Sequence, residues 1–156
     1  MLKILFVCTG NTCRSPMAEA LLKNMLSGEK LRYEIEVLSA GLSSFPGEKV
    51  SHEVIKLLQN EGVGNIQDRR SVMLDRLMVD EADLIFVMTG DHLRKLTALF
   101  PFTKGKAYKL TDYAECFGGA DIDDPIGQDE EIYRKVLEDI RVCLKNLISK
   151  LELRGG

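Results

Sequence analysis

A cysteine and an arginine bracket a short glycine-containing segment near the start of the chain, Cys8-Thr9-Gly10-Asn11-Thr12-Cys13-Arg14. An apolar run, residues 4–7, precedes this segment, and Ser15-Pro16 follows it at the beginning of a helical pattern. Successive backbone N–H groups in such a turn, reinforced by the dipole of the following helix, can form a cradle for a tetrahedral oxyanion. The spacing therefore predicts a phosphate-binding loop.

The side chains of this loop suit attack on phosphorus. Gly10 permits close approach of the backbone, and Asn11 tolerates left-handed dihedral angles. Arg14 can donate two parallel hydrogen bonds to phosphoryl oxygens. In the same positive field Cys8 is expected to ionise to a thiolate, to which Ser15 can donate a hydrogen bond. We expect Cys8 to be a nucleophile and Arg14 to clamp the oxygens around its target.

Phosphoryl transfer also needs an acid to protonate the leaving group. The acidic segment at residues 120–131 offers Asp121, Asp123 and Asp124 ahead of the last helical pattern. Asp124 precedes Pro125, which disfavours helix at the aspartate and suits a carboxyl group held out towards a pocket. Asp124 is therefore the predicted general acid.

These residues need elements that position them. Continuous apolar runs at residues 4–7 and 84–88 predict buried strands, and residues 34–38 and 107–110 are weaker candidates. Helical periodicity marks four further segments, residues 16–26, 50–59, 93–100 and 130–153. The alternation favours an α/β sandwich around a mainly parallel sheet, in which ligands bind beyond the carboxyl ends of the strands. Cys8 lies at one such end.

Composition limits the class of protein. The chain has 156 residues and no linker-like tract, so residues 1–156 are expected to form one domain. A net charge of −3 does not favour electrostatic binding of nucleic acid. No apolar stretch is long enough for a membrane span. The N-terminus lacks the apolar core of a secretion signal, so we expect a cytoplasmic protein.

The remaining cysteines and histidines suggest no metal centre. The four cysteines include no Cys-x-x-Cys pair, and the two histidines, His52 and His92, have no partner at metal-ligand spacing. Cys116 and Cys143 are expected to be ordinary thiols. Neither histidine is assigned a role. A nucleotide P-loop is excluded, since no Gly-Lys precedes Ser or Thr.

The run from Cys8 to Ala20, together with Asp124-Pro125, resembles the low-molecular-weight protein tyrosine phosphatase family over essentially the whole chain. The resemblance implies a three-layer sandwich with a four-stranded parallel sheet, no metal and no cofactor. It implies a phosphocysteine intermediate on Cys8 and phosphoryl binding by Arg14 and the loop from Thr9 to Cys13. Asp124 would act as acid and then as base. Cys13 would close a reversible disulfide with Cys8 that prevents overoxidation. Phosphorylated proteins would be the partners of a monomer.

Thr12 bears on which phosphorylated side chain enters. Many tyrosine-specific members carry a bulky aliphatic residue there, whereas the bacterial protein-arginine phosphatase branch resembles this chain in having threonine. Two departures from the family concern the surroundings of the loop. Ile126-Gly127 stands where the family has aromatic residues, and residues 64–70 lack a histidine that supports the loop in many members.

We therefore favour a protein phosphatase for phosphoarginine, with a phosphotyrosine-specific phosphatase as the alternative. Arsenate reduction on the same fold ranks low, because it needs two further cysteines after the third strand and residues 88–92 supply none. A non-catalytic phosphate-binding module also ranks low, since Cys8, Arg14 and Asp124 are all intact.

Overall fold

The structure is a computed structural model that describes residues 1–64 and 66–155. In this part of the chain four parallel strands form one sheet. The strands are β1 (Leu2–Cys8), β2 (Ile35–Gly41), β3 (Leu84–Val87) and β4 (Ala107–Lys109), in the order β2-β1-β3-β4. Val7 of β1 pairs with Ala40 of β2 and with Val87 of β3. The carboxyl end of β1, with Cys8, thus lies between the ends of two neighbours.

The helices predicted from periodicity are all present. The helices are α1 (Arg14–Leu26), α2 (His52–Asn60), α3 (Arg76–Glu81), α4 (Gly90–Leu99), α5 (Leu110–Tyr113) and α6 (Glu130–Lys150), with short 3-10 turns at Pro101–Thr103 and Phe117–Gly119. Helices α3 and α5 were not predicted, because six and four residues are too few to show a periodic apolar pattern. None of the described helices combines the length and apolar character that crossing a bilayer requires.

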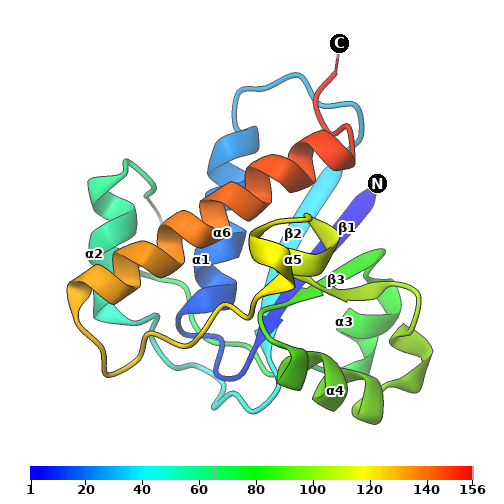
Figure 1. Cartoon of the computed structure of the whole chain (residues 1–156), viewed down its shortest axis with the longest axis horizontal. Coiled ribbons are helices and arrows are strands. Elements are labelled where there is room, and N and C mark those ends of the chain that lie inside the picture. The colour runs from blue at the N-terminus through cyan, green and yellow to red at the C-terminus, as the bar shows by residue number, and fades with distance from the viewer. Residues whose placement is uncertain (65, 156) are drawn as a thin grey trace.

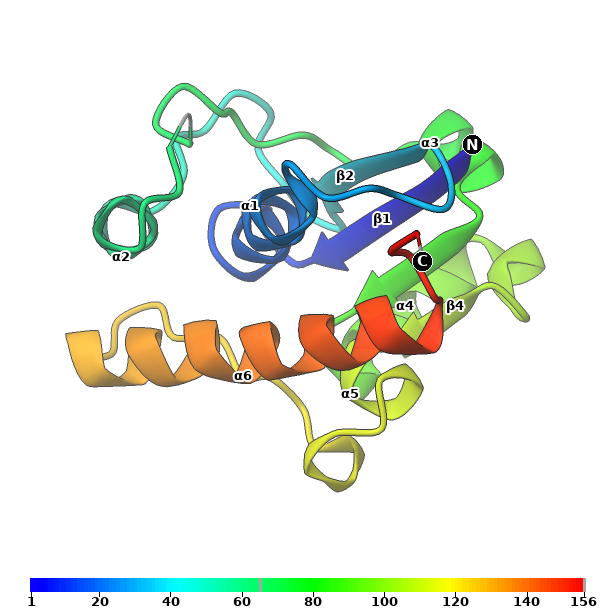
Figure 2. The same cartoon turned by 90° about the horizontal axis from the view of Figure 1, so that it is seen from above.

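The sheet separates two apolar clusters. Ile4 and Phe6 belong to the cluster that includes the apolar faces of α1, α2 and α6. Leu5 and Val7 belong to the other cluster, with residues of α3 and α4. Strand residues that alternate between two buried faces produce the continuous apolar run seen in the sequence. Figures 1 and 2 show α6 crossing α1, with its first turns beside α2, and Figure 2 shows the strands above α6. The predicted three-layer α/β sandwich is confirmed.

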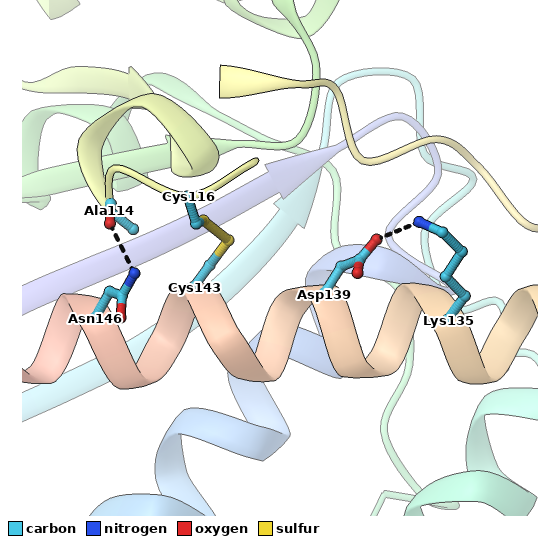
Figure 3. Close-up of a disulfide and its surroundings, with 6 residues drawn as sticks. All are labelled: Ala114, Cys116, Lys135, Asp139, Cys143 and Asn146. Carbon is cyan, nitrogen blue, oxygen red and sulfur yellow. Dashed lines mark hydrogen bonds and ion pairs between the residues drawn. A yellow bond between two sulfur atoms is a disulfide. The ribbon is translucent and has the colours of Figure 1, made fainter. Parts of the chain in front are cut away.

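Cys116 and Cys143 form a disulfide bond, so the expectation that they are ordinary thiols was wrong. Figure 3 shows this bond between the turn after α5 and the middle of α6. Next to it Asn146 Nδ2 donates a hydrogen bond to the Ala114 carbonyl oxygen at 3.1 Å. The two cysteines are 27 positions apart in sequence, and their Cα atoms are 6.1 Å apart. Their pairing depends on how the turn packs against α6, which the sequence pattern does not reveal.

Candidate active site

The segment from Cys8 to Arg14, called the phosphate loop below, connects the end of β1 to the first residue of α1. Neighbouring amides donate to four of its carbonyl oxygens: Leu42 to Cys8 (2.9 Å), Ser43 to Thr9 (2.9 Å), Ser51 to Thr12 (2.8 Å) and Met17 to Cys13 (3.0 Å). In a trans peptide the following N–H group points away from the carbonyl oxygen, and the described residues contain no cis peptide. The amides that follow these carbonyls therefore point away from the donors and are left for a ligand.

Cys8 is 2% exposed, and its Sγ lies 2.9 Å from Ser15 Oγ. Asn11 fixes the direction of this hydrogen bond. Its Oδ1 accepts from the Val72 amide at 2.9 Å, and its Nδ2 donates to Ser15 Oγ at 2.8 Å. Since the Ser15 oxygen already accepts one hydrogen bond, its own hydrogen is free to point at sulfur. The Ser15 hydroxyl therefore donates its hydrogen bond to the Cys8 sulfur.

Arg14 crosses from the phosphate loop to the acidic segment. Its Nη1 donates to the Ile122 carbonyl oxygen at 2.9 Å, and its Nη2 lies 3.8 Å from Asp124 Oδ2. The side chain is buried, and its Nε has no protein partner among the described residues. A buried guanidinium N–H without a partner is costly unless a ligand satisfies it. Arg14 is thus fixed at one end and retains donors for an oxyanion.

The geometry distinguishes Asp124 from Asp121. The side chain of Asp124 is 44% exposed, and its Oδ1 accepts a hydrogen bond from the Ile126 amide at 3.0 Å. Asp121 instead accepts from the Gly90 amide at 3.0 Å and from Lys109 Nζ at 3.1 Å, and these bonds lower its pKa. A carboxyl group that is held ionised in this way is a poor proton donor. Of the two carboxyl groups, Asp124 is the one that lies beside Arg14.

A buried polar network supports the phosphate loop from behind. Asn11 has a φ of 56° and is fully buried, and its Nδ2 also lies 3.0 Å from Ser39 Oγ on β2. Ser39 Oγ accepts from Arg69 Nη2 at 2.6 Å and donates to Glu19 Oε1 of α1 at 2.6 Å. Arg69 Nη2 also lies 3.1 Å from Glu19 Oε1 and 3.0 Å from the Ser39 carbonyl oxygen. Arg69 belongs to residues 64–70, the stretch that lacks the histidine found in many family members. It supports the phosphate loop through Ser39, which contacts Asn11.

Two other loop residues differ in burial. Cys13 is 3% exposed, and its pKa is raised by burial and by the charges of Asp124 and Cys8. Its thiol is free, as is that of Cys8. Thr12 is half-buried, between Asn11 and Cys13 in the loop. No cluster of three or more His, Cys, Asp or Glu side chains within the described ranges has the arrangement of a metal site.

Sequence reasoning missed two residues that adjoin the loop. His92 of α4 is buried, and its Nε2 lies 2.9 Å from Thr9 Oγ1. Phe45 is 75% exposed on the segment between β2 and α2, which the hydrogen bonds of Leu42 and Ser43 attach to the phosphate loop. Phe45 is therefore an exposed aromatic side chain on a segment attached to the loop, and Ile126 is exposed as well. The contact between His92 and Thr9 spans 83 positions and follows no local sequence signal.

Comparison with known proteins agrees with this site. The sequence pattern of the family described as low molecular weight phosphotyrosine protein phosphatase matches residues 3–154. A protein-arginine-phosphatase of Geobacillus stearothermophilus is 36% identical over 151 residues, 96% of either chain. The crystal structure of a YwlE mutant from Bacillus subtilis superimposes with a TM-score of 0.88 at 31% identity, covering 97% of this chain and 99% of the other. A low molecular weight protein tyrosine phosphatase from T. tengcongensis gives 0.86 at 32% identity, covering 96% and 99%.

The chain belongs to the low molecular weight phosphotyrosine protein phosphatase family. It is accordingly a hydrolase that acts on phosphorylated protein side chains.

Proposed function

We propose that this phosphatase works through a phosphocysteine intermediate on Cys8, with phosphoarginine as its favoured substrate. The observation that carries the chemistry is the convergence of three groups at one loop. The Cys8 sulfur faces the Ser15 hydroxyl, Arg14 retains an unpartnered Nε, and Asp124 lies 3.8 Å from Arg14. These are a nucleophile, an oxyanion clamp and an acid in mutual reach.

In the first step Cys8 Sγ attacks phosphorus while the bond from phosphorus to the leaving oxygen or nitrogen breaks. The Asp124 carboxyl group gives its proton to the leaving atom. In the second step the Asp124 carboxylate takes a proton from water as the water oxygen attacks phosphorus. The phosphorus–sulfur bond breaks, and inorganic phosphate and the Cys8 thiolate are released.

Electrostatic stabilisation comes from Arg14 and from the backbone amides of residues 9–14. The Arg14 guanidinium supplies a positive charge, and the backbone N–H dipoles point at the equatorial oxygens of the phosphoryl group, where negative charge is concentrated. Because Arg14 is held by the Ile122 carbonyl and the loop carbonyls are held by neighbouring segments, little reorganisation accompanies the reaction. The Ser15 hydroxyl stabilises the thiolate before attack and again when Cys8 becomes the leaving group.

Two observations support phosphoarginine over phosphotyrosine. Thr12 brings a hydroxyl to a half-buried position of the loop, which suits the polar guanidinium better than an aliphatic side chain would. Relatives named protein-arginine-phosphatase are 36% and 34% identical over 96% of this chain. The tyrosine alternative is supported by relatives named as low molecular weight protein-tyrosine-phosphatases, which are 36% identical over 78% of this chain and 32% identical over 97% and 94% of it.

The deciding experiment compares kcat/KM on two peptides of one sequence that differ only in carrying phosphoarginine or phosphotyrosine. Thr12→Ile is expected to lower the ratio of phosphoarginine to phosphotyrosine turnover by about tenfold or more. Thr12→Val, which keeps the shape and removes the hydroxyl, separates hydrogen bonding from volume. A preference of the unmutated enzyme for phosphotyrosine would refute the arginine assignment and leave the chemistry intact. Turnover by Cys8→Ser would refute the nucleophile.

The less favoured functions have less support in this site. Cys116, in the turn after α5, and Cys143, in α6, are bonded to each other and therefore do not serve as a free thiol relay for arsenate reduction. A module that only bound phosphate would gain nothing from the Asp124 carboxyl group beside Arg14, because a carboxylate repels a bound oxyanion. We expect the enzyme to act as a monomer on phosphorylated proteins, which size-exclusion chromatography with light scattering can check.

A further inference from the structure

His92 occupies a buried position that the catalytic steps above do not use. It lies in the first turn of α4, where Thr89 Oγ1 accepts a hydrogen bond from its amide at 3.1 Å. The register that pairs Val7 with Val87 brings the segment after β3 beside the phosphate loop. The imidazole is consequently only 3% exposed and contacts the Thr9 hydroxyl at 2.9 Å.

The surroundings of His92 keep its ring neutral. Burial, followed by the positive charge of Arg14, lowers the pKa of His92 to about 4. Lys95 acts in the same direction, whereas the carboxylates of Asp91 and Asp121 oppose it. A neutral ring also avoids placing a second positive charge beside the arginine that binds the phosphoryl group.

The hydrogen-bond inventory selects one tautomer of the neutral ring. His92 Nδ1 is buried and has no protein partner among the described residues. A buried N–H without a partner is rarer and more costly than a buried acceptor without one. The hydrogen therefore belongs on Nε2, which donates to Thr9 Oγ1. The Thr9 hydroxyl then acts as acceptor towards His92 and keeps its own hydrogen for another acceptor.

We propose that His92 is a positioning residue that orients the Thr9 hydroxyl as a hydrogen-bond donor to a phosphoryl oxygen. The proposal rests on the proposed function of the phosphate loop as an oxyanion site. It extends that site by one side-chain donor, Thr9 Oγ1, which is exposed on the loop and directed by the buried ring behind it. His92 acts through Thr9 and does not touch the substrate.

The test measures binding of inorganic phosphate by calorimetry, so that it does not depend on turnover. His92→Leu, which fills the space without a donor, is expected to weaken binding about tenfold, the effect of one hydrogen bond to a charged oxygen. Thr9→Val is expected to cause a similar loss. The double variant should bind phosphate about as weakly as either single variant, because both changes remove the same hydrogen bond. His92→Gln, which carries a neutral donor, should restore binding to within about threefold.

Two results would overturn the proposal. One is an additive effect in the double variant, about a hundredfold, which would make His92 and Thr9 independent. The other is a nitrogen-15 NMR spectrum of the folded enzyme near neutral pH that shows the imidazole hydrogen on Nδ1. If His92→Leu is too unstable to measure, the comparison of His92→Gln with Thr9→Val and the NMR assignment still decide the question. Failure of Cys8→Ser to abolish turnover would refute the proposed chemistry without affecting these binding results.

Discussion

Arg69 offers a direct test of whether the network behind the phosphate loop controls catalysis. Its side chain is 17% exposed and that of its partner Glu19 is 12% exposed, so the pair is largely shielded from water. Arg69→Met keeps the aliphatic stem and removes the guanidinium. The change deletes two hydrogen bonds to Ser39, at 2.6 and 3.0 Å, one to the Arg70 carbonyl oxygen, and the ion pair with Glu19. Glu19 is not stranded, because Ser39 Oγ and Lys23 Nζ still contact it.

The magnitude follows from those contacts. Each lost hydrogen bond contributes about 1 kcal/mol, and hydrogen bonds to charged groups contribute about 1.5–3 kcal/mol. Since Glu19 keeps other partners, the cost stays below the roughly 3–5 kcal/mol of a fully stranded buried charge. We expect Arg69→Met to lower the free energy of unfolding by about 2–4 kcal/mol. For a chain of this size that is a fall in Tm of about 5–15 °C.

Activity should fall as well, because Ser39 loses the group that fixes its hydroxyl against Asn11. We expect kcat/KM to decrease about tenfold at a temperature well below the lowered Tm. Arg69→Lys should recover part of the stability and little of the activity, since one ammonium group cannot replace the guanidinium fork. The matched control is Arg70→Met, which removes the same charge from an exposed neighbour. Equal Tm and kcat/KM values for the two methionine variants would refute the role of Arg69.

Four further outcomes follow from the geometry. Asp124→Asn should lower kcat by about 10²–10⁴-fold on phosphoarginine peptides, and less on an aryl phosphate whose leaving group needs no proton; equal losses would contradict its role as acid. Peroxide should inactivate the enzyme reversibly, with thiol recovery poorer in Cys13→Ser; equal recovery would exclude a protective disulfide with Cys8. Cys143→Ser should lower the free energy of unfolding by about 3–4 kcal/mol, from a cross-link spanning 27 positions, and chemical denaturation with and without reductant provides the check. Folding lowers the pKa of His92 to about 4, so between about pH 6.5 and 4 the unfolded chain binds a proton that the folded chain does not. The free energy of unfolding should therefore decrease by up to about 3 kcal/mol as the pH is lowered through this range. A pH profile that is equally steep in His92→Gln would contradict this.

Local patterns were enough to predict the reactive loop and most of the scaffold. Cys8 and Arg14 stand at the junction of an apolar run and a helix start, and that junction is where β1 ends and α1 begins. The end of α6 was placed at residue 153, whereas the helix stops at Lys150 because Glu152 takes a positive φ of 51°. Such a terminus depends on backbone dihedrals that apolar periodicity does not report.

The supporting residues could not be predicted, because their contacts are distant in sequence. Ser39 lies 28 positions from Asn11, Arg69 lies 30 from Ser39, and His92 lies 83 from Thr9. Each of these residue types is common on protein surfaces, and only the sheet order brings them to one edge. The family resemblance implied only a four-stranded parallel sheet, and the order β2-β1-β3-β4 was not predicted, because strand patterns do not report which strands are neighbours.

The hydrogen bonds around the phosphate loop divide into two groups with different purposes. Behind the loop the donors and acceptors of Asn11, Ser39 and Arg69 are matched, which fixes the left-handed turn at Asn11. In front of it the buried Nε of Arg14 has no protein partner within residues 1–64 and 66–155. Matched groups rigidify, whereas an unmatched buried donor raises the energy of the free enzyme and is relieved when an oxyanion binds. In the proposed mechanism this unmatched donor lies where negative charge develops in the reaction, so disrupting the network of Asn11, Ser39 and Arg69 should cost activity even though its role is to hold the loop.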